Sequence, residues 1–314
     1  MRKLFDLKHL IGNTPIIEIK YSYKNKNRTA YMKAEWFNLT GSIKDRVAYN
    51  ILSKAIKRGE LKQGQPIVEV TSGNMGISLS AIGGYLGHKV VVFMPENMSE
   101  ERKKILLSYG AELHLTKEFK SAFNEAEEYV KEYNDYRTNQ FDNIENTLTY
   151  KNTLAKEIVG QIGCNFDSVV AGVGTSGTIM GLSSVFKKLG KKIYAVEPKS
   201  SSLLSMGKSM GKHKIQGLSD DIVPSLYKKE NIDGVISIED DDAIAMAHKL
   251  GKYGLGVGVS GGANFLGCVL SENKISVSIF PDDNKKYLQN YKNNVTTKLV
   301  NAIKIKGIRV IKIK

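Results

Sequence analysis

The chain has 314 residues, with 46 Lys or Arg against 32 Asp or Glu, and its formal net charge is +14. No apolar run approaches the ~20 residues that span a bilayer, and the first residues lack the apolar core of a signal peptide, so we expect a cytoplasmic protein without a membrane partner. Two cysteines and five histidines without metal-ligand spacing argue against a disulfide framework and a metal site.

Short apolar, β-branched runs alternate with amphipathic segments along the chain. Strands are predicted at residues 16–19, 67–70, 89–94, 112–115, 168–171, 192–196 and 275–280, and helices include residues 99–109 and 243–252. This alternation is typical of an α/β fold with mostly parallel sheets. Ligands of such sheets bind at the carboxyl ends of the strands, where the glycine-rich turns 71–78, 171–178 and 256–264 are predicted to fall.

Lys44 follows a Gly-Ser pair in NLTGSIKDR (38–46) and opens a stretch with helical spacing of apolar residues. Its amine is therefore expected at a helix start, where the positive end of the helix dipole disfavours a protonated lysine. A lysine that attacks an aldehyde must be neutral, so this position suits a Schiff-base lysine. Taken alone, Lys44 would be an ordinary solvated lysine, but the motifs around it favour the catalytic interpretation.

Two glycine-rich turns resemble anion-binding loops. TSGNMGIS (71–78) and AGVGTSGT (171–178) each follow a predicted strand and precede a helical pattern. Such strand-to-helix turns present backbone N–H groups and hydroxyls to an anion. One turn suits a cofactor phosphate and the other suits a substrate carboxylate.

The C-terminal part of the chain carries two further patterns. In 254–262 the apolar residues Leu255, Val257 and Val259 predict a buried strand that runs into a turn at Ser260. From Lys285 onward there are nine Lys or Arg residues and no Asp or Glu, which leaves +5 on the first 284 residues. The body is thus mildly basic and carries no nucleic-acid motif, so we expect no nucleic-acid partner. The last 14 residues alternate apolar with basic side chains, as a half-buried or edge strand does.

These motifs, in this order, resemble the cysteine synthase and cystathionine β-synthase family of pyridoxal-phosphate enzymes. The resemblance rests on IGNTP (11–15), GSIKDR (41–46), TSGNMGIS (71–78), MPENMSEERKKILLSYGAE (94–112), NQF (139–141), AGVGTSGT (171–178), VEP (196–198), HKIQG (213–217), GVGVSGGAN (256–264) and FPDDNKKYL (280–288). It implies fold type II, similar to the tryptophan synthase β subunit, with two lobes that each contain a mostly parallel twisted sheet flanked by helices. It further implies a smaller, mobile substrate lobe at 39–149, a larger lobe for the cofactor phosphate at 1–38 plus 150–288, and a basic tail of unknown role at 289–314, without counterpart in the family.

The resemblance also implies roles for individual residues. Lys44 matches the lysine that holds pyridoxal 5'-phosphate as a Schiff base and moves the substrate α-proton. Asn74 is similar to the residue that bonds the ring hydroxyl of the cofactor, and Ser260 matches the serine that faces the pyridine nitrogen. The phosphate cradle corresponds to Gly174, Thr175, Ser176, Gly177 and Thr178, and the carboxylate site to Thr71, Ser72, Gly73, Met75 and Gln140.

A serine at position 260 has a chemical consequence. A neutral hydroxyl does not keep the pyridine nitrogen protonated as an aspartate does, so the cofactor is a weaker electron sink. This favours α,β-elimination over transamination.

Two departures from the family pattern concern the reaction. Met75 stands where the family usually has threonine, which removes a hydroxyl from the carboxylate loop. Asp220 and Asp221, in QGLSDDIVPS (216–225), stand where many members have glycine and alanine. In the family this loop lies at the mouth of the active site, so an aspartate there is a candidate catalytic general base. An Asp pair in a loop equally often caps a helix or faces solvent.

The leading interpretation is therefore a β-elimination and β-replacement enzyme on a serine- or cysteine-type amino acid, similar to cysteine synthase, which joins O-acetylserine and sulfide to L-cysteine. The alternative is a lyase that consumes L-cysteine and releases sulfide, giving L-serine or lanthionine. A hydroxyamino-acid dehydratase and a regulatory protein that binds the serine acetyltransferase C-terminus are more remote alternatives. By resemblance we expect a homodimer, with a small amino acid and sulfide as partners.

Overall fold

The structure is a computed structural model that describes residues 2–71, 73–209, 211–219, 222–290 and 295–311. Its helices are α1 (Arg2–Lys8), α2 (Lys44–Arg58), α3 (Asn74–Leu86), α4 (Glu100–Ser108), α5 (Phe119–Tyr133), α6 (Ile144–Asn152), α7 (Leu154–Ile162), α8 (Gly177–Phe186), α9 (Leu203–Met206), α10 (Asp240–Gly251), α11 (Val259–Leu270) and α12 (Lys298–Ala302). Its strands are β1 (Ile16–Tyr23), β2 (Lys26–Ala34), β3 (Ile67–Val70), β4 (Val90–Pro95), β5 (Glu112–Thr116), β6 (Tyr136–Arg137), β7 (Ser168–Gly172), β8 (Lys192–Pro198), β9 (Gly234–Ile238), β10 (Ile275–Phe280) and β11 (Lys304–Ile311).

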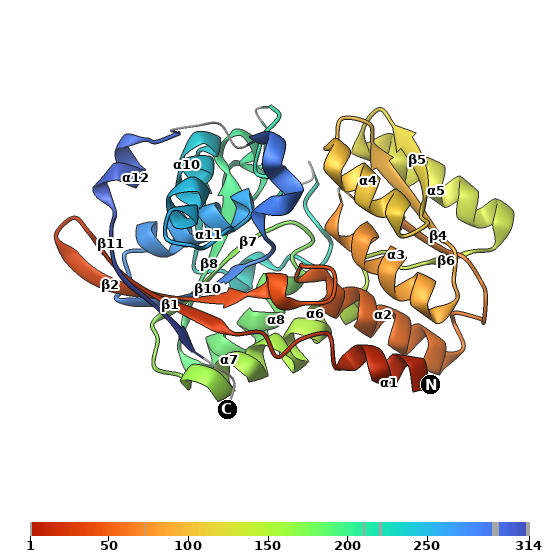
Figure 1. Cartoon of the computed structure of the whole chain (residues 1–314), viewed down its shortest axis with the longest axis horizontal. Coiled ribbons are helices and arrows are strands. Elements are labelled where there is room, and N and C mark those ends of the chain that lie inside the picture. The colour runs from red at the N-terminus through yellow and green to blue at the C-terminus, as the bar shows by residue number, and fades with distance from the viewer. Residues whose placement is uncertain (1, 72, 210, 220–221, 291–294, 312–314) are drawn as a thin grey trace.

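The strands form two sheets on opposite sides of the molecule (Figure 1). The small sheet has the order β5-β4-β3-β6 and is parallel throughout. The large sheet has the order β11-β1-β2-β10-β7-β8-β9, with its five strands from β2 to β9 parallel and β1 antiparallel to both of its neighbours. The predicted α/β class with mostly parallel sheets is confirmed.

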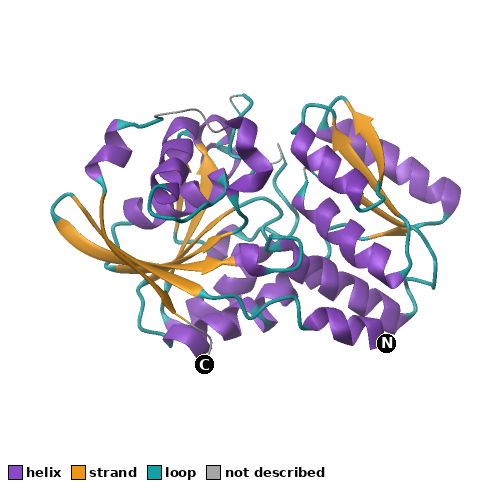
Figure 2. Cartoon of the chain, in the orientation of Figure 1, coloured by secondary structure: helices purple, strands orange, loops and turns teal. Residues whose placement is uncertain are grey.

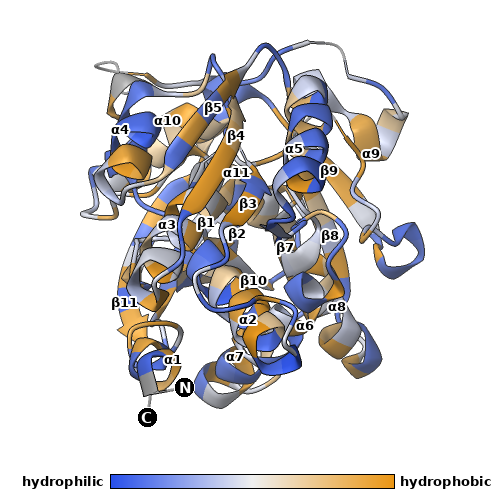
Figure 3. Cartoon of the chain, turned by 90° about the vertical axis from the view of Figure 1, so that its right-hand side faces the viewer, coloured by the Kyte–Doolittle hydropathy of each residue, from blue (hydrophilic) through white to orange (hydrophobic). Residues whose placement is uncertain are grey.

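Helices cover both faces of the large sheet (Figure 2). Helix α11 packs on β7 and β10, and α8 packs on β7 and β8. In the small sheet, β4 is buried along its whole length and is coloured hydrophobic over most of it in Figure 3. Ala122 and Ala126 of α5 pack on one face of this sheet, while the other face joins the core that α2 and α3 share with β7 and α8. Parallel strands buried on both faces explain why these segments are continuous apolar runs.

No helix in the described ranges is long and apolar enough to cross a membrane.

The seven strands and the two helices predicted from the alternation all occur. The additional strand predicted at 254–262 does not form, so that prediction is wrong. Val257 forms an isolated β-bridge to Asp283 outside the strands, and Val259 already begins α11. The glycines here permit close contact rather than a strand ladder, because a Cβ on Gly258 would lie 2.1 Å from Asp282 Oδ1. The third glycine-rich turn therefore follows a loop, and does not end a strand.

The basic tail forms α12 and the edge strand β11. Strand β11 pairs antiparallel with β1 from Ile16↔Ile311 to Ser22↔Lys304, and Arg309 donates to Glu18 Oε2 at 2.6 Å. Val300 and Ile303 are buried against the core that includes α10 and α11. The edge strand predicted from the alternation is confirmed, whereas the proposed lobe boundaries and the mobility of 39–149 stay predictions.

A buried ionic cluster connects the start of α2 with β2, the residues that follow β2, and α7. The Arg46 guanidinium donates to both Glu35 oxygens at 2.6 and 2.9 Å and to both Glu157 oxygens at 2.6 and 2.8 Å. Lys33 Nζ donates to Glu157 Oε2 at 2.7 Å. Burial alone raises the pKa of Glu157, but the hydrogen bonds and charges of Arg46 and Lys33 outweigh it and lower the pKa to about 2. Glu157 is thus a carboxylate that stabilises two buried cations.

We expect Glu157→Gln to lower the unfolding free energy by about 3 kcal/mol at neutral pH, because it leaves two buried cations with one anion. The folded pKa lies below the ordinary value of 4.5, so the stabilisation is present above about pH 4.5 and is lost as the pH falls toward 2. Urea unfolding of both proteins at several pH values measures the difference, which is expected to shrink over this interval.

The control is Glu127→Gln, which removes an exposed pair with Lys131 on α5. Its effect on the unfolding free energy is expected to be far smaller than that of Glu157→Gln, because solvent screens an exposed ion pair. A Glu157→Gln penalty that is equally small, or one that is constant from pH 7 to pH 3, would contradict the assignment.

Candidate active site

The turn after β3 brings Thr71, Gly73, Asn74 and Met75 to the junction between the sheets. Strand β3 is fully buried, and Gly73 N–H donates to Thr71 Oγ1 at 3.1 Å. Gly73 has φ = 152°, and a Cβ there would lie 2.6 Å from Arg102 Cδ. A side chain would therefore strain both the backbone and the contact with α4. The prediction for Ser72 falls outside the described residues.

The turn after β7 is the predicted phosphate cradle. Ser176 precedes α8 with φ = 67°, and its Oγ is buried without a hydrogen-bond partner in the described part of the chain. A Cβ on Gly174 would lie 2.5 Å from the carbonyl oxygen of Gly217, so the loop passes directly against that backbone. The N-terminal N–H groups of the ten-residue helix α8 begin here. A buried, unpartnered hydroxyl at a helix N-terminus fits an anionic phosphate.

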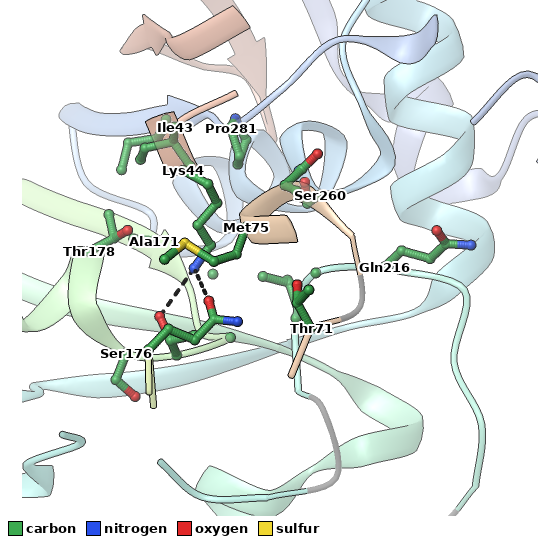
Figure 4. Close-up of a pocket in the computed structure, with 18 of the residues that line it drawn as sticks. Ile43, Lys44, Thr71, Met75, Ala171, Ser176, Thr178, Gln216, Ser260 and Pro281 are labelled. Carbon is green, nitrogen blue, oxygen red and sulfur yellow. Dashed lines mark hydrogen bonds between the residues drawn. The ribbon is translucent and has the colours of Figure 1, made fainter. Parts of the chain in front are cut away.

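Lys44 lies between these two turns. It is the first residue of α2, as the sequence predicts, and its side chain extends into the pocket (Figure 4). Lys44 Nζ lies 3.2 Å from Thr175 Oγ1 and 3.4 Å from Gln140 Oε1. The amine therefore contacts one residue of the predicted phosphate cradle and one of the predicted carboxylate site.

Most of the predicted site residues line one pocket. These are Lys44, Thr71, Asn74, Met75, Gln140, Gly174, Thr175, Ser176, Thr178 and Ser260. Gly73 and Gly177 belong to the same turns but not to the lining. Asp220 and Asp221 lie outside the described residues. The individual roles of all these residues stay predictions.

Residues that the sequence reasoning missed hold the pocket loops. Glu69 is buried in β3 and accepts from Gln140 N–H at 3.1 Å and from Thr138 Oγ1 at 2.6 Å, and burial raises the pKa of its carboxyl group. Asn146 Nδ2 donates to the Gln140 carbonyl at 2.8 Å and to Thr175 Oγ1 at 2.9 Å. A carboxylate inside the apolar strand IVEV was the available signal for Glu69. Nothing in the local sequence marks Asn146.

The first turns of α11 complete the site. Ser260 is buried and lines the pocket, and Asn264 follows one turn later. Asn264 Oδ1 accepts from Gly172 N–H, and its Nδ2 donates to the Ile279 carbonyl, both at 2.8 Å. Asn264 thus fixes the carboxyl ends of β7 and β10 relative to Ser260.

The donor set fits pyridoxal phosphate. The cradle with the unpartnered Ser176 hydroxyl suits the phosphate, Lys44 supplies the amine, and the Asn74 amide and the Ser260 hydroxyl are available to the ring. The Ser176 hydroxyl, which is buried and has no hydrogen-bond partner among the described residues, is the observation that supports an anion site here.

Comparisons with known proteins agree with this fit. The family model described as pyridoxal-phosphate dependent enzyme matches residues 7–282. The chain is 40% identical to cysteine synthase B of Campylobacter jejuni over 87% of this chain and 90% of that protein. Among solved structures it is similar to a hydrogen sulfide-producing enzyme from Fusobacterium nucleatum, with a TM-score of 0.94 and 42% identity over 99% of both chains. Cysteine synthase from Entamoeba histolytica has a TM-score of 0.85 and 38% identity over 94% and 93% of the two chains.

The comparison corrects one expectation about the tail. Similarity over 99% of this chain includes most of residues 289–314, so the tail has a counterpart in the Fusobacterium structure. The expectation that it has none in the family is wrong.

We expect Gly174→Ala to weaken pyridoxal phosphate binding by about tenfold or more, because the new Cβ forces the loop away from Gly217. Fluorescence titration of the apoprotein with the cofactor measures the dissociation constant. The matched control is Gly160→Ala on the exposed side of α7, where a Cβ meets nothing within 4 Å. Equal affinity of the two variants would contradict a cradle at Gly174.

Proposed function

Because the chain belongs to the family of pyridoxal-phosphate dependent enzymes, we propose that its pocket carries out cysteine synthase-like β-elimination and β-replacement on a serine- or cysteine-type amino acid. The observation that carries the proposal is the position of the Lys44 amine. It lies 3.2 Å from Thr175 in the cradle and 3.4 Å from Gln140 in the predicted carboxylate site. An amine between two anion sites is positioned to act on an amino acid held next to the cofactor.

The residues around the Lys44 amine have different proposed roles in the reaction. Bound pyridoxal phosphate supplies an electron-withdrawing ring that stabilises negative charge at the substrate α-carbon. Lys44 Nζ takes the α-proton as a general base and returns it at the end of the reaction. Thr71 and Gln140 bind the substrate carboxylate and so orient the bond that breaks. Gln140 donates its backbone N–H to Glu69 and accepts from Asn146 at its carbonyl, and these two bonds keep it in place.

Two reactions are candidates: consumption of L-cysteine with release of sulfide, and synthesis of L-cysteine from sulfide. We propose the first. The similarity to a hydrogen sulfide-producing enzyme over 99% of both chains supports this direction, and it extends through the tail. Met75, buried in the pocket lining where the family usually has threonine, is a further difference from the biosynthetic pattern. Synthesis of cysteine from O-acetylserine and sulfide is the second candidate, supported by the cysteine synthase relatives.

The proposed net reaction converts L-cysteine and water into L-serine and hydrogen sulfide. The Cβ–S bond breaks and sulfide leaves with a proton, and a water oxygen then bonds to Cβ. Asp220 or Asp221 is proposed to take the proton of that water as general base. A second cysteine thiol in place of water gives lanthionine.

The oligomeric state and protein partners are proposed from the resemblance. We propose a homodimer, to be checked by light scattering. Binding of a serine acetyltransferase C-terminus and hydroxyamino-acid dehydration remain predictions without a specific observation in their favour.

With purified holoenzyme, we expect L-cysteine to yield sulfide together with serine or lanthionine, and O-acetylserine plus sulfide to yield cysteine more slowly. Sulfide assay and chromatography of the amino acids measure both reactions. Fast cysteine synthesis with little turnover of cysteine would overturn the proposed direction and establish the second candidate.

Separate Asp220→Asn and Asp221→Asn variants test the proposed base. Loss of serine formation in one of them identifies that residue. Sulfide and serine release that is unchanged in both would remove the aspartates from the mechanism.

We expect Lys44→Ala to lower turnover by about 10³-fold or more, because it removes both the Schiff-base amine and the general base. Borohydride reduction followed by mass spectrometry is a second measurement, since the wild-type chain is expected to retain the cofactor mass on Lys44 and the variant is not. Lys54→Ala, an exposed lysine on the same helix, is the control with wild-type behaviour. Cofactor mass retained elsewhere in the chain would contradict the assignment.

A further inference from the structure

The side-chain amide of Asn74 is held from both ends by the segment that follows β10. Asn74 Nδ2 donates to Asp282 Oδ2 at 2.8 Å, and Lys286 Nζ donates to Asn74 Oδ1 at 3.1 Å. The anion on one side and the cation on the other determine which end of the amide is nitrogen. Asn74 begins α3 beside the small sheet, whereas Asp282 and Lys286 follow the last parallel strand of the large sheet.

Both charged residues are buried. Asp282 is 0% exposed and Lys286 is 5% exposed. Burying a carboxylate and an ammonium is costly even when they are compensated, so such a pair is poor evidence for stability. Here the Asn74 amide lies between the two charges and bonds to both, so that its orientation depends on them.

The same segment holds two other parts of the pocket. Lys286 Nζ also donates to the Gly41 carbonyl at 3.2 Å, in the loop that leads to Lys44. Tyr287 OH donates to Asp282 Oδ2 at 2.5 Å and accepts from Arg102 at 2.8 Å. Arg102 comes from α4 and lines the pocket. Residues 282–287 thus connect three pieces of the site that come from different elements.

The bonding pattern determines what Asn74 offers to a ligand. Its oxygen is occupied by Lys286, and one of its two N–H groups is occupied by Asp282. The remaining N–H is a donor, and Asn74 lines the pocket. A donor held in this way suits an anionic oxygen, and the ring oxygen of pyridoxal phosphate is of that kind.

We propose that Asp282 and Lys286 are positioning residues that fix the Asn74 amide with its second N–H toward the cofactor ring oxygen. The inference rests on the proposed function, because it assumes that pyridoxal phosphate occupies the pocket. It assigns to these two residues a role through Asn74, without contact with the substrate.

Lys286→Met tests the proposal, because it removes the cation while keeping most of the side-chain volume. The Asn74 amide then loses the partner of its oxygen and is held by Asp282 alone. The dissociation constant of pyridoxal phosphate is expected to rise about tenfold, and the absorption and fluorescence spectra of the bound cofactor are expected to shift. Lys286→Arg, which keeps a cationic donor, is expected to restore most of both properties. Lys285→Met changes the same charge at the neighbouring exposed residue, which pairs with Asp283, and is expected to match the wild type.

A double-mutant cycle separates positioning from a structural role. In the Asn74→Ala background, Lys286→Met is expected to change the cofactor dissociation constant less than twofold, because its effect passes through the missing amide. Effects of the two substitutions that multiply in full would overturn the proposal. So would a Lys286→Met variant that loses thermal stability but keeps wild-type cofactor affinity and spectra.

Asp282→Asn, which keeps the side-chain shape, provides the same cycle if Lys286→Met yields no folded protein. A coupling with Asn74→Ala supports the proposal, and independent effects overturn it. Failure of the wild-type protein to bind pyridoxal phosphate would instead remove the proposed function, so the two failures are distinguishable.

Discussion

The site depends on how the first turn of α2 is anchored. Three consecutive residues there point to three different environments. Lys44 reaches the pocket, and Asp45 accepts from the Thr40 backbone and hydroxyl at 2.7 and 2.6 Å. Arg46 is buried between Glu35 and Glu157. Because a helix start has little internal hydrogen bonding of its own, these contacts determine where the Lys44 amine lies.

Parallel sheets explain why the other site residues converge. Thr71 follows β3, Thr175 follows β7 and Asp282 follows β10, so each comes after the carboxyl end of a strand. The carboxyl ends of β3 in the small sheet and of β7 and β10 in the large sheet therefore meet at one pocket. Asn264 and the 282–287 segment then set the distances between the turns, through hydrogen bonds that cross from one element to another. Binding residues lie on loops, but buried polar groups keep those loops in position.

Periodicity and turn chemistry predicted the elements that act locally. The apolar run before Thr71 is a buried strand, Lys44 does begin a helix, and the alternating tail does form an edge strand. The prediction failed at 254–262, since glycines that allow close backbone contact look the same in sequence as glycines of a turn after a strand. Strand β2, with its charged and polar residues, was also not predicted, because its burial comes from its neighbours β1 and β10.

The sequence by itself determined which reactive groups the protein carries: an amine at a helix start, two glycine-rich turns and a serine at position 260, in an order that identifies the enzyme family. These are properties of residue type and local spacing, which short-range geometry largely dictates. Only the tertiary structure decided which polar residues hold that chemistry in place. Glu69, Asn146, Asp282 and Lys286 act through partners as far as 245 positions away. No local pattern encodes such a contact, because it exists only once both sheets have packed.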